Sequence, residues 1–190
     1  MGTTIKCGLS AQSLLKAADE VRKYRASLED KCREFREQLV KVGIDSAKAN
    51  CGAYAGMIMF YQQDVSSNMT MLIAVDNAKI VRTWYASKRD ALAGKNPRSY
   101  SVSPLLLSEF GSGWLSKVLF DIDGVGQGTM PGQTHAFDAN GWFWYDEDGV
   151  KQHSEGEAPT HPMYAASMAM LVEIENVARK VFGTNEVIQC

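Results

Sequence analysis

The chain has 190 residues, of which 45% are hydrophobic and 22% are charged, and its net charge is −2. These values are typical of a folded globular protein and exclude a disordered chain, and the length predicts a single domain spanning residues 1–190. A protein that holds DNA through its phosphates carries an excess of basic residues, so the charge also speaks against nonspecific DNA binding.

The first ten residues lack the apolar run of a signal peptide, and no stretch of about 18 apolar residues follows them. We therefore expect a protein that is made in the cytosol and has no membrane-spanning segment. The cysteines show no CxxC spacing, which favours free thiols over a metal site or a disulfide framework. They are Cys7, Cys32, Cys51 and Cys190.

A helical region is predicted over residues 10–51, because its apolar residues follow a three-four spacing. The stripe consists of Leu14, Ala18, Val21, Leu28, Cys32, Phe35, Leu39 and Val42, with an interruption at Arg25. Ser27 and Asp30 have the spacing of an N-cap pair, which predicts two helices with a break at residues 25–27, and Gly43 is typical of a helix end. A coiled coil is one alternative, but the length of the stripe favours packing on a sheet or on a neighbouring subunit.

Residues 54–87 predict three antiparallel strands. The runs AGMIMFYQQD and MTMLIAVD are rich in strand-forming residues and flank a turn-prone segment at residues 64–68, which predicts a hairpin. A third run, KIVRTWYAS, predicts another strand, with a helix as an open alternative. Residues 88–98 are charged and contain Gly94 and Pro97, which predicts a loop.

The apolar stretch that begins at Tyr100 leads into the sequence LLLSEFGSGW. This pattern predicts a strand or short helix that ends at a sharp turn made by Gly111 and Gly113. Residues 114–140 are rich in glycine and predict a long loop. A loop of this length is typical of an arm or a partner-contact element, and a plain disordered insertion is the alternative.

A hairpin is predicted over residues 141–154, because the aromatic run GWFWY is followed by the turn-prone run DEDG. Trp142 and Trp144 then share one face of a strand. On that face they either contact the core or another subunit, or they form an exposed aromatic ledge for a ligand.

The last predicted element is a helix over residues 161–182, in which Thr160 can cap the start and Pro162 can occupy the first turn. Its apolar stripe consists of Met163, Ala166, Met170, Ile174, Val177 and Val181. The fold class predicted from all these elements is α+β. It has a small antiparallel β-sheet packed by a long N-terminal helical region and a C-terminal helix, with a long loop insertion.

The glycine clusters at residues 111–113 and 124–128 do not fit a nucleotide site. A P-loop needs the pattern GxxxxGK[ST] between a strand and a helix, and a dinucleotide fingerprint opens a βαβ unit. Neither cluster has the lysine or the parallel flanks that these sites need. No nucleotide cofactor is expected.

Three histidines, His135, His153 and His161, lie among acidic residues and could in principle bind a metal or act as acid and base. Their spacing matches no metal-binding or catalytic motif, and no pattern pairs a cysteine with a histidine as a nucleophile. We therefore predict a protein that is not an enzyme and that has no metal or cofactor, and keep a metal-dependent hydrolase as an alternative.

The order of these parts resembles that of the tail-completion or head-to-tail joining proteins of long-tailed bacteriophages. The resemblance covers roughly residues 10–183 and rests on Glu109-Phe110-Gly111-Ser112-Gly113, on the aromatic strand, and on Pro162-Met163-Tyr164 at the start of the last helix. The chain departs from the family in its glycine-rich residues 116–140 and in Met163, where an aromatic residue is common. This departure leaves the role of the loop open.

The resemblance implies a non-enzymatic virion protein of the neck, assembled in the cytoplasm of a host bacterium. Such a protein forms a homo-oligomeric ring, usually a hexamer, at the end of the tail tube. The ring contacts the tail-tube protein and the head connector or stopper protein, and DNA passes through it without specific binding. No membrane is involved.

Within this family the motif residues have structural roles. Gly111 and Gly113 are assigned to backbone conformations that side chains would obstruct, Phe110 to anchoring the turn in the core, and Glu109 to a buried or intersubunit hydrogen bond or ion pair. The remaining candidate motif and subunit-contact residues are Ser112, Trp142, Trp144, Pro162 and Met163. The alternatives are the hydrolase, a ligand-binding module with an aromatic ledge, and a small α+β protein of another role.

Overall fold

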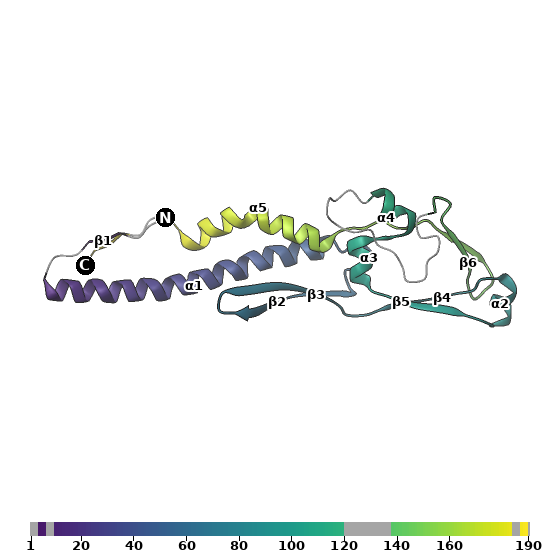
Figure 1. Cartoon of the computed structure of the whole chain (residues 1–190), viewed down its shortest axis with the longest axis horizontal. Helices are drawn as coiled ribbons and strands as arrows, with labels where there is room; N and C mark the ends of the chain where they lie inside the picture. The colour runs from purple at the N-terminus through teal and green to yellow at the C-terminus, as the bar shows by residue number, and fades with distance from the viewer. Residues whose placement is uncertain (1–3, 7–9, 120–137, 184–186, 190) are drawn as a thin grey trace. The chain divides into compact units, whose positions relative to one another are not determined.

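A computed structural model describes residues 4–6, 10–119, 138–183 and 187–189 of the chain. It confirms the α+β class: a long N-terminal helix, small two-stranded sheets and a C-terminal helix follow one another along the chain (Figure 1). No helix in these residues is both long and apolar enough to cross a membrane.

The described residues form two compact units, and the single domain predicted from the sequence stays a prediction. Unit 1 contains the residues up to Gly43, Gln62–Leu72 and the residues from Met168 onward, and unit 2 contains Ile44–Tyr61 and the described part of Ile73–Ser167. The buried apolar residues of unit 1 are Val40, Val177 and Val181. Those of unit 2 are Ala47, Cys51, Ile58, Phe60, Tyr85, Ala91, Val102, Leu107 and Ala166.

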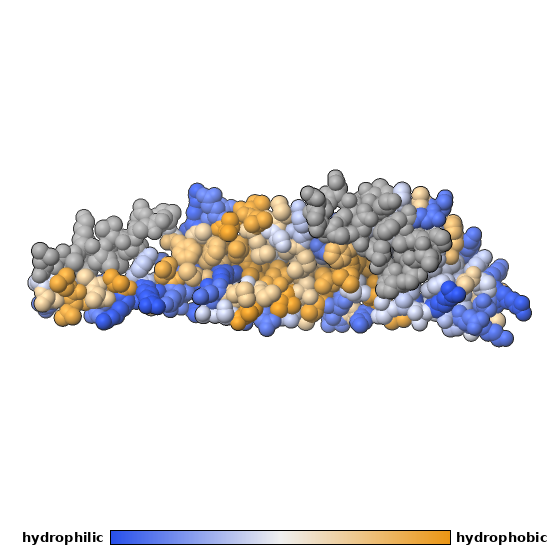
Figure 2. Space-filling view, in the orientation of Figure 1, coloured by the Kyte–Doolittle hydropathy of each residue, from blue (hydrophilic) through white to orange (hydrophobic). Residues whose placement is uncertain are grey.

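Many hydrophobic side chains lie at the surface instead of in these cores. Figure 2 shows such side chains over the C-terminal helix α5 (Pro162–Phe182) and along the N-terminal helix α1 (Ala11–Ala49). The exposed large hydrophobic residues of these two helices are Leu14, Leu15, Val21, Leu28, Tyr164, Met168, Leu171, Val172 and Ile174.

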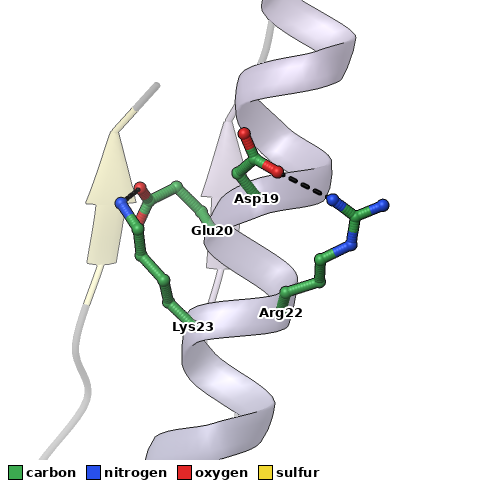
Figure 3. Close-up of polar contacts among 4 residues, drawn as sticks. All are labelled: Asp19, Glu20, Arg22 and Lys23. Atoms are coloured by element: carbon green, nitrogen blue, oxygen red, sulfur yellow. Dashed lines mark hydrogen bonds and ion pairs between the residues drawn. The ribbon is translucent and has the colours of Figure 1, made fainter.

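Helix α1 is continuous, so the predicted break at residues 25–27 was wrong. Asp30, which resembled part of a cap, instead pairs with Arg33 one turn later at 2.6 Å. Further ion pairs of this kind, Asp19 with Arg22 and Glu20 with Lys23, bridge successive turns near its start (Figure 3). Pairs at this spacing support a solvated helix by a few tenths of a kcal/mol each, roughly 0.2–0.5.

Gly43 does not end α1, as the sequence pattern had predicted, but lies inside it. A Cβ atom on Gly43 would lie 2.9 Å from Leu72 Cδ1 and 2.9 Å from Met170 Sδ. The glycine therefore lets a strand and α5 approach the helix closely within unit 1. In the same unit, the rings of Phe35 and Phe182 lie 5.7 Å apart.

The predicted strands of residues 54–87 are present, but they do not form one sheet. A 3₁₀ turn, η1 (Gly52–Tyr54), follows α1, and then β2 (Ile58–Ser66) pairs with β3 (Met69–Asp76). The two-residue connection between these strands requires an antiparallel hairpin. The third strand, β4 (Ile80–Trp84), instead pairs antiparallel with β5 (Arg98–Val102), which aligns Arg82 with Tyr100.

The loop predicted at residues 88–98 contains a helix, α2 (Lys88–Ala93), whose start is capped by the Ser87 side chain. Helix α3 (Pro104–Phe110) follows β5 and provides the short helix that the sequence predicted before Gly111. The loop prediction for residues 114–140 was wrong at its start, where α4 (Gly113–Leu119) is helical. Residues 120–137 lie outside the described part of the chain.

The aromatic hairpin consists of β6 (Trp142–Tyr145) and β7 (Lys151–Ser154), which pair antiparallel, and β8 (Gly156–Glu157) follows. Helix α5 begins at Pro162, one residue after the start predicted at 161. Near the ends of the chain, β1 (Thr4–Lys6) pairs parallel with β9 (Val187–Gln189). The predicted antiparallel pairing is therefore correct for β4–β5 and β6–β7, whereas no strand had been predicted at the positions of β1 and β9.

Candidate functional site

Two of the three features on which the family resemblance rests, residues 109–113 and residues 162–164, meet in space in unit 2. The Glu109 carboxylate at the end of α3 accepts the backbone N–H of Met163 at 2.7 Å and that of Tyr164 at 3.2 Å. These N–H groups belong to the first turn of α5, where no carbonyl of the helix itself can accept them. A carboxylate there also interacts favourably with the positive end of the helix dipole.

Backbone hydrogen bonds complete this contact. The carbonyl of Ser108 accepts the N–H of Thr160 at 2.7 Å and that of His161 at 2.9 Å. We call Ser108, Glu109 and the four residues they bind, Thr160, His161, Met163 and Tyr164, the α3–α5 joint. Pro162, inside this segment, is fully buried.

The cap of α5 differs from the prediction. Thr160 does not cap the helix, because its hydroxyl donates to the Ser108 carbonyl at 3.2 Å. Glu109, from a distant part of the sequence, supplies the acceptor instead. The residue before Pro162, His161, has a positive φ of 52°, which turns the chain into the helix.

Glu109 is largely buried, with 9% of its surface exposed, so its charge acts on neighbouring groups with little screening by water. Burial raises the pKa of the nearby Cys51 thiol, and the negative charge of Glu109 raises that pKa further. The Cys51 thiol also donates to the Ala47 carbonyl at 3.2 Å. These surroundings favour the neutral thiol over the thiolate, and hence an inert cysteine over a nucleophile.

Gly111 and Gly113 turn the chain out of α3 with positive φ angles of 65° and 66°. A Cβ on Gly111 would overlap the Glu157 carbonyl and lie 2.8 Å from the Pro159 nitrogen. A Cβ on Gly113 would lie 2.8 Å from the Glu155 carbonyl oxygen. Both glycines thus allow the turn to lie directly against the β8 backbone.

Ser112 lies between these glycines, is buried, and forms a backbone bridge with Glu157. Phe110 is half-buried, and the role assigned to its side chain as a core anchor stays a prediction. Its carbonyl accepts the Ser116 hydroxyl at 2.6 Å. The glycine motif is consequently a packed turn against β8.

A second polar cluster of unit 2 is centred on the Glu157 side chain. One carboxylate oxygen accepts the Tyr54 hydroxyl, and the other accepts the Arg82 guanidinium. Burial and the hydrogen bond to Glu157 raise the pKa of Tyr54 to about 12, with the Glu157 charge adding to the shift and Arg82 opposing it. Hydrogen bonding to Glu157 and its charge raise the pKa of Arg82 against the effect of burial.

An alkaline titration should detect this cluster. Because the folded-state pKa of Tyr54 is raised from 10.0 to about 12, its protonated form adds stability that is complete below pH 10 and disappears as the pH rises to about 12. We expect one phenolate absorbance step near pH 12, and we expect this step to vanish in Tyr54→Phe. A Tyr54→Phe profile identical to wild type across this range would contradict the assignment.

All four tryptophans of the chain line one pocket of about 220 Å³ in unit 2. The rings of Trp142 and Trp144 stack with centroids 5.0 Å apart, and Trp84 meets Trp142 edge-on at 4.8 Å. Trp114 is the fourth tryptophan that lines the pocket. Trp142 and Trp144 therefore share a face, as the strand pattern predicted, and that face borders a cavity.

Polar groups also line this pocket. Arg82, Tyr100 and Glu155 reach its wall, together with the backbone of Gly113, Gly141 and Gly156. The Arg98 guanidinium lies 5.0 Å from the centre of the Trp84 ring, which is cation–π geometry. The pocket thus combines flat aromatic surfaces with hydrogen-bonding groups.

The histidines are not gathered into one site in the described residues. The His153 Nε2 donates to the Asn140 carbonyl at 2.9 Å, and its ring stacks on Phe143 at 4.3 Å, whereas His161 lies in the α3–α5 joint. His135 lies outside the described residues. In the part of the chain that the structure describes, no group of three or more histidine, cysteine or acidic residues could hold a metal ion.

Sequence reasoning missed several residues of these sites. Tyr54, Arg82 and Glu157 carried no motif, because their contacts join segments up to 103 residues apart. For the tryptophan pocket the sequence offered one indication. The chain has only four tryptophans, so Trp84 and Trp114 were candidates alongside Trp142 and Trp144.

Comparison of the whole chain with protein-family models, curated proteins and solved structures gives no match.

Proposed function

We propose that the chain is a structural subunit of a phage neck, which completes the tail by forming a homo-oligomeric ring between the tail tube and the head connector. The proposal starts from the resemblance of the chain to tail-completion proteins. It implies a subunit with no catalytic residues, whose motif residues maintain the surfaces that meet neighbouring chains. The ring, its stoichiometry and its partners belong to this proposal.

The observation that carries the proposal is the α3–α5 joint. The resemblance rests in part on two short motifs, and Glu109 of the first accepts a hydrogen bond from the backbone of Met163, 54 positions later, in the second. Both carboxylate oxygens of Glu109 accept hydrogen bonds from the α5 backbone. The motif residues are thus occupied in joining helices, which supports an architectural role.

The described sheets also suit assembly, because each has only two strands. Apart from the bridge between Tyr85 and Tyr145, which joins the ends of β4 and β6, such a sheet leaves an outer backbone edge on each strand. Open edges of this kind pair readily with another chain. Head-to-tail contacts between different surfaces of identical subunits produce closed rings when the rotation closes.

The purified chain tests this proposal directly. Electron micrographs should show closed rings with a central channel, and mass photometry should give one multiple of the 20.9 kDa subunit mass. Genes for a capsid, a connector and a tail-tube protein should flank the gene. A chain that remains monomeric at high concentration, or a gene located among unrelated genes, would count against it.

A ligand-binding module is the second candidate, and the tryptophan pocket favours it. Stacked indole rings beside Arg82, Glu155 and backbone groups suit a saccharide, because sugars have an apolar face and a polar rim. Titration with a saccharide panel should then change tryptophan fluorescence saturably. The change should be lost in Trp144→Ala, and a panel without any saturable change would remove this candidate.

A further inference from the structure

The apolar seam of α1 is covered in one half and open in the other. Near its C-terminal half, Phe35 contacts Phe182 and Gly43 packs against Met170. Further toward the N-terminus, side chains of the same three-four stripe are exposed by 50% at Leu14, 52% at Val21 and 37% at Leu28. The seam therefore continues beyond the point where the described chain covers it.

Within unit 1, α5 is apolar on two opposite faces. Val177 and Val181 are buried, whereas Met168, Leu171 and Val172 are 43%, 64% and 68% exposed. The exposed residues have the spacing of one helix face, and Glu175 continues that face one turn later. A helix with apolar residues on both sides is typical of one buried on both sides.

Charged residues near the start of α1 are matched within the helix. Asp19 pairs with Arg22 at 2.9 Å and Glu20 pairs with Lys23 at 2.7 Å, so these charges are matched within the helix (Figure 3). Hydrophobic side chains at the surface of α1 and α5 are visible in Figure 2. Leu14, Val21 and Leu28 on α1, and Met168, Leu171 and Val172 on α5, form an exposed apolar strip along one face of each helix.

Pairing of the α1 seam with its own copy in parallel is unfavourable. Arg25 is part of the seam, so it would face a second Arg25. The same arrangement brings Lys31 of one helix opposite Arg36 of the other, because these are the flanking positions of successive heptads. Like charges at these positions select against this pairing.

The α1 and α5 strips fit each other instead. If the two helices run parallel, an offset of 150 residues aligns Val21 with Leu171 and Arg25 with Glu175. Four residues later the same offset aligns Glu29 with Arg179. Within α1 the basic Arg25 precedes its partner Glu29, and within α5 the acidic Glu175 precedes its partner Arg179. The parallel alignment therefore places opposite charges next to each other at both positions.

We propose that the α1 strip (Leu14, Ala18, Val21, Arg25, Leu28) of one subunit packs on the α5 strip (Met168, Leu171, Val172, Glu175) of a second copy of this chain. The contact joins two different surfaces and is therefore head-to-tail, as a ring requires. This inference rests on the proposed ring and adds the surfaces that form it.

The first test replaces apolar strip residues and measures assembly by mass photometry. Leu171→Glu is matched by Leu92→Glu on α2, because the two leucines are 64% and 65% exposed. Leu171→Glu and Val21→Glu should each raise the concentration of half-assembly by about tenfold or more, the effect of losing a central contact, with unchanged circular dichroism. Leu92→Glu should assemble like wild type.

The second test reverses charges. Arg25→Glu should weaken assembly, and adding Glu175→Arg should restore it by at least half of the loss. Wild-type rings that persist in Leu171→Glu and Val21→Glu would overturn the strip contact while leaving the ring intact. Loss of assembly only in Val21→Glu would show a different occupant on α1 and also overturn the pairing. A wild-type chain that stays monomeric would contradict the ring itself.

Discussion

Replacing Gly111 by valine should prevent the chain from folding or assembling. The residue has φ 65° and ψ −161°, a region that is essentially restricted to glycine. Any Cβ there also overlaps the Glu157 carbonyl, which belongs to the backbone and cannot rotate away. A β-branched side chain adds further overlap. Circular dichroism and size-exclusion chromatography should show an unfolded or aggregated protein.

A pair of milder variants compares the surroundings of two glycines that both have positive φ. Gly94 also has a positive φ of 61°, but a Cβ there meets nothing within 4 Å. Gly94→Ala should cost about 1 kcal/mol of unfolding free energy, whereas Gly111→Ala should cost about 3 kcal/mol or more, because backbone strain and overpacking add. Urea unfolding measures both, and equal losses would show that neither the backbone conformation of Gly111 nor its packing against Glu157 adds to the cost.

Glu109→Ala should have the second largest effect. The change leaves the N–H groups of Met163 and Tyr164 without their acceptors in a buried setting, at a cost of about 1–3 kcal/mol for each unsatisfied group. Loss of the favourable charge at the start of α5 adds to it. We expect urea unfolding to show a loss of about 2–4 kcal/mol, a large part of the 5–15 kcal/mol that is typical of a domain.

The conservative variant Glu109→Gln tests this mechanism. Glutamine has only one side-chain oxygen, so it retains one of the two acceptors and places a donor near the other N–H. The unfolding free energy of Glu109→Gln should lie between that of the wild type and that of Glu109→Ala. Glu147→Ala, at an exposed position of the β6–β7 turn, serves as the control and should change stability by less than about 0.5 kcal/mol. Equal stability of Glu109→Ala and this control would contradict the capping role.

Local patterns were sufficient for the elements whose stability is local. The apolar spacing predicted α5 to within one residue at its start, and the aromatic run with its DEDG turn predicted β6 and β7. The break predicted from Ser27 and Asp30 was wrong because the cap pattern also occurs inside helices, where Asp30 pairs with Arg33. Such a pattern does not distinguish a cap from an ion pair.

Contacts between distant segments could not be predicted. Gly43 has the sequence signature of a helix end, but its role depends on Leu72 and Met170, which approach from elsewhere in the chain. β4 pairs with β5 across α2, although β3 was nearer in sequence. For the site, the sequence indicated Glu109 and the two glycines, but it contained no information on which helix Glu109 would cap.

The α3–α5 joint also determines when α5 can be completed during folding. The bond from Met163 to Glu109 closes a loop across 54 positions, and closing such a loop costs entropy that local helix contacts do not. Helix α1, stabilised by neighbours along the chain, can form early, whereas the start of α5 must wait for α3. Protection of the Met163 amide in pulse-labelling hydrogen exchange should therefore arise late, and it marks the moment at which the start of α5 is completed.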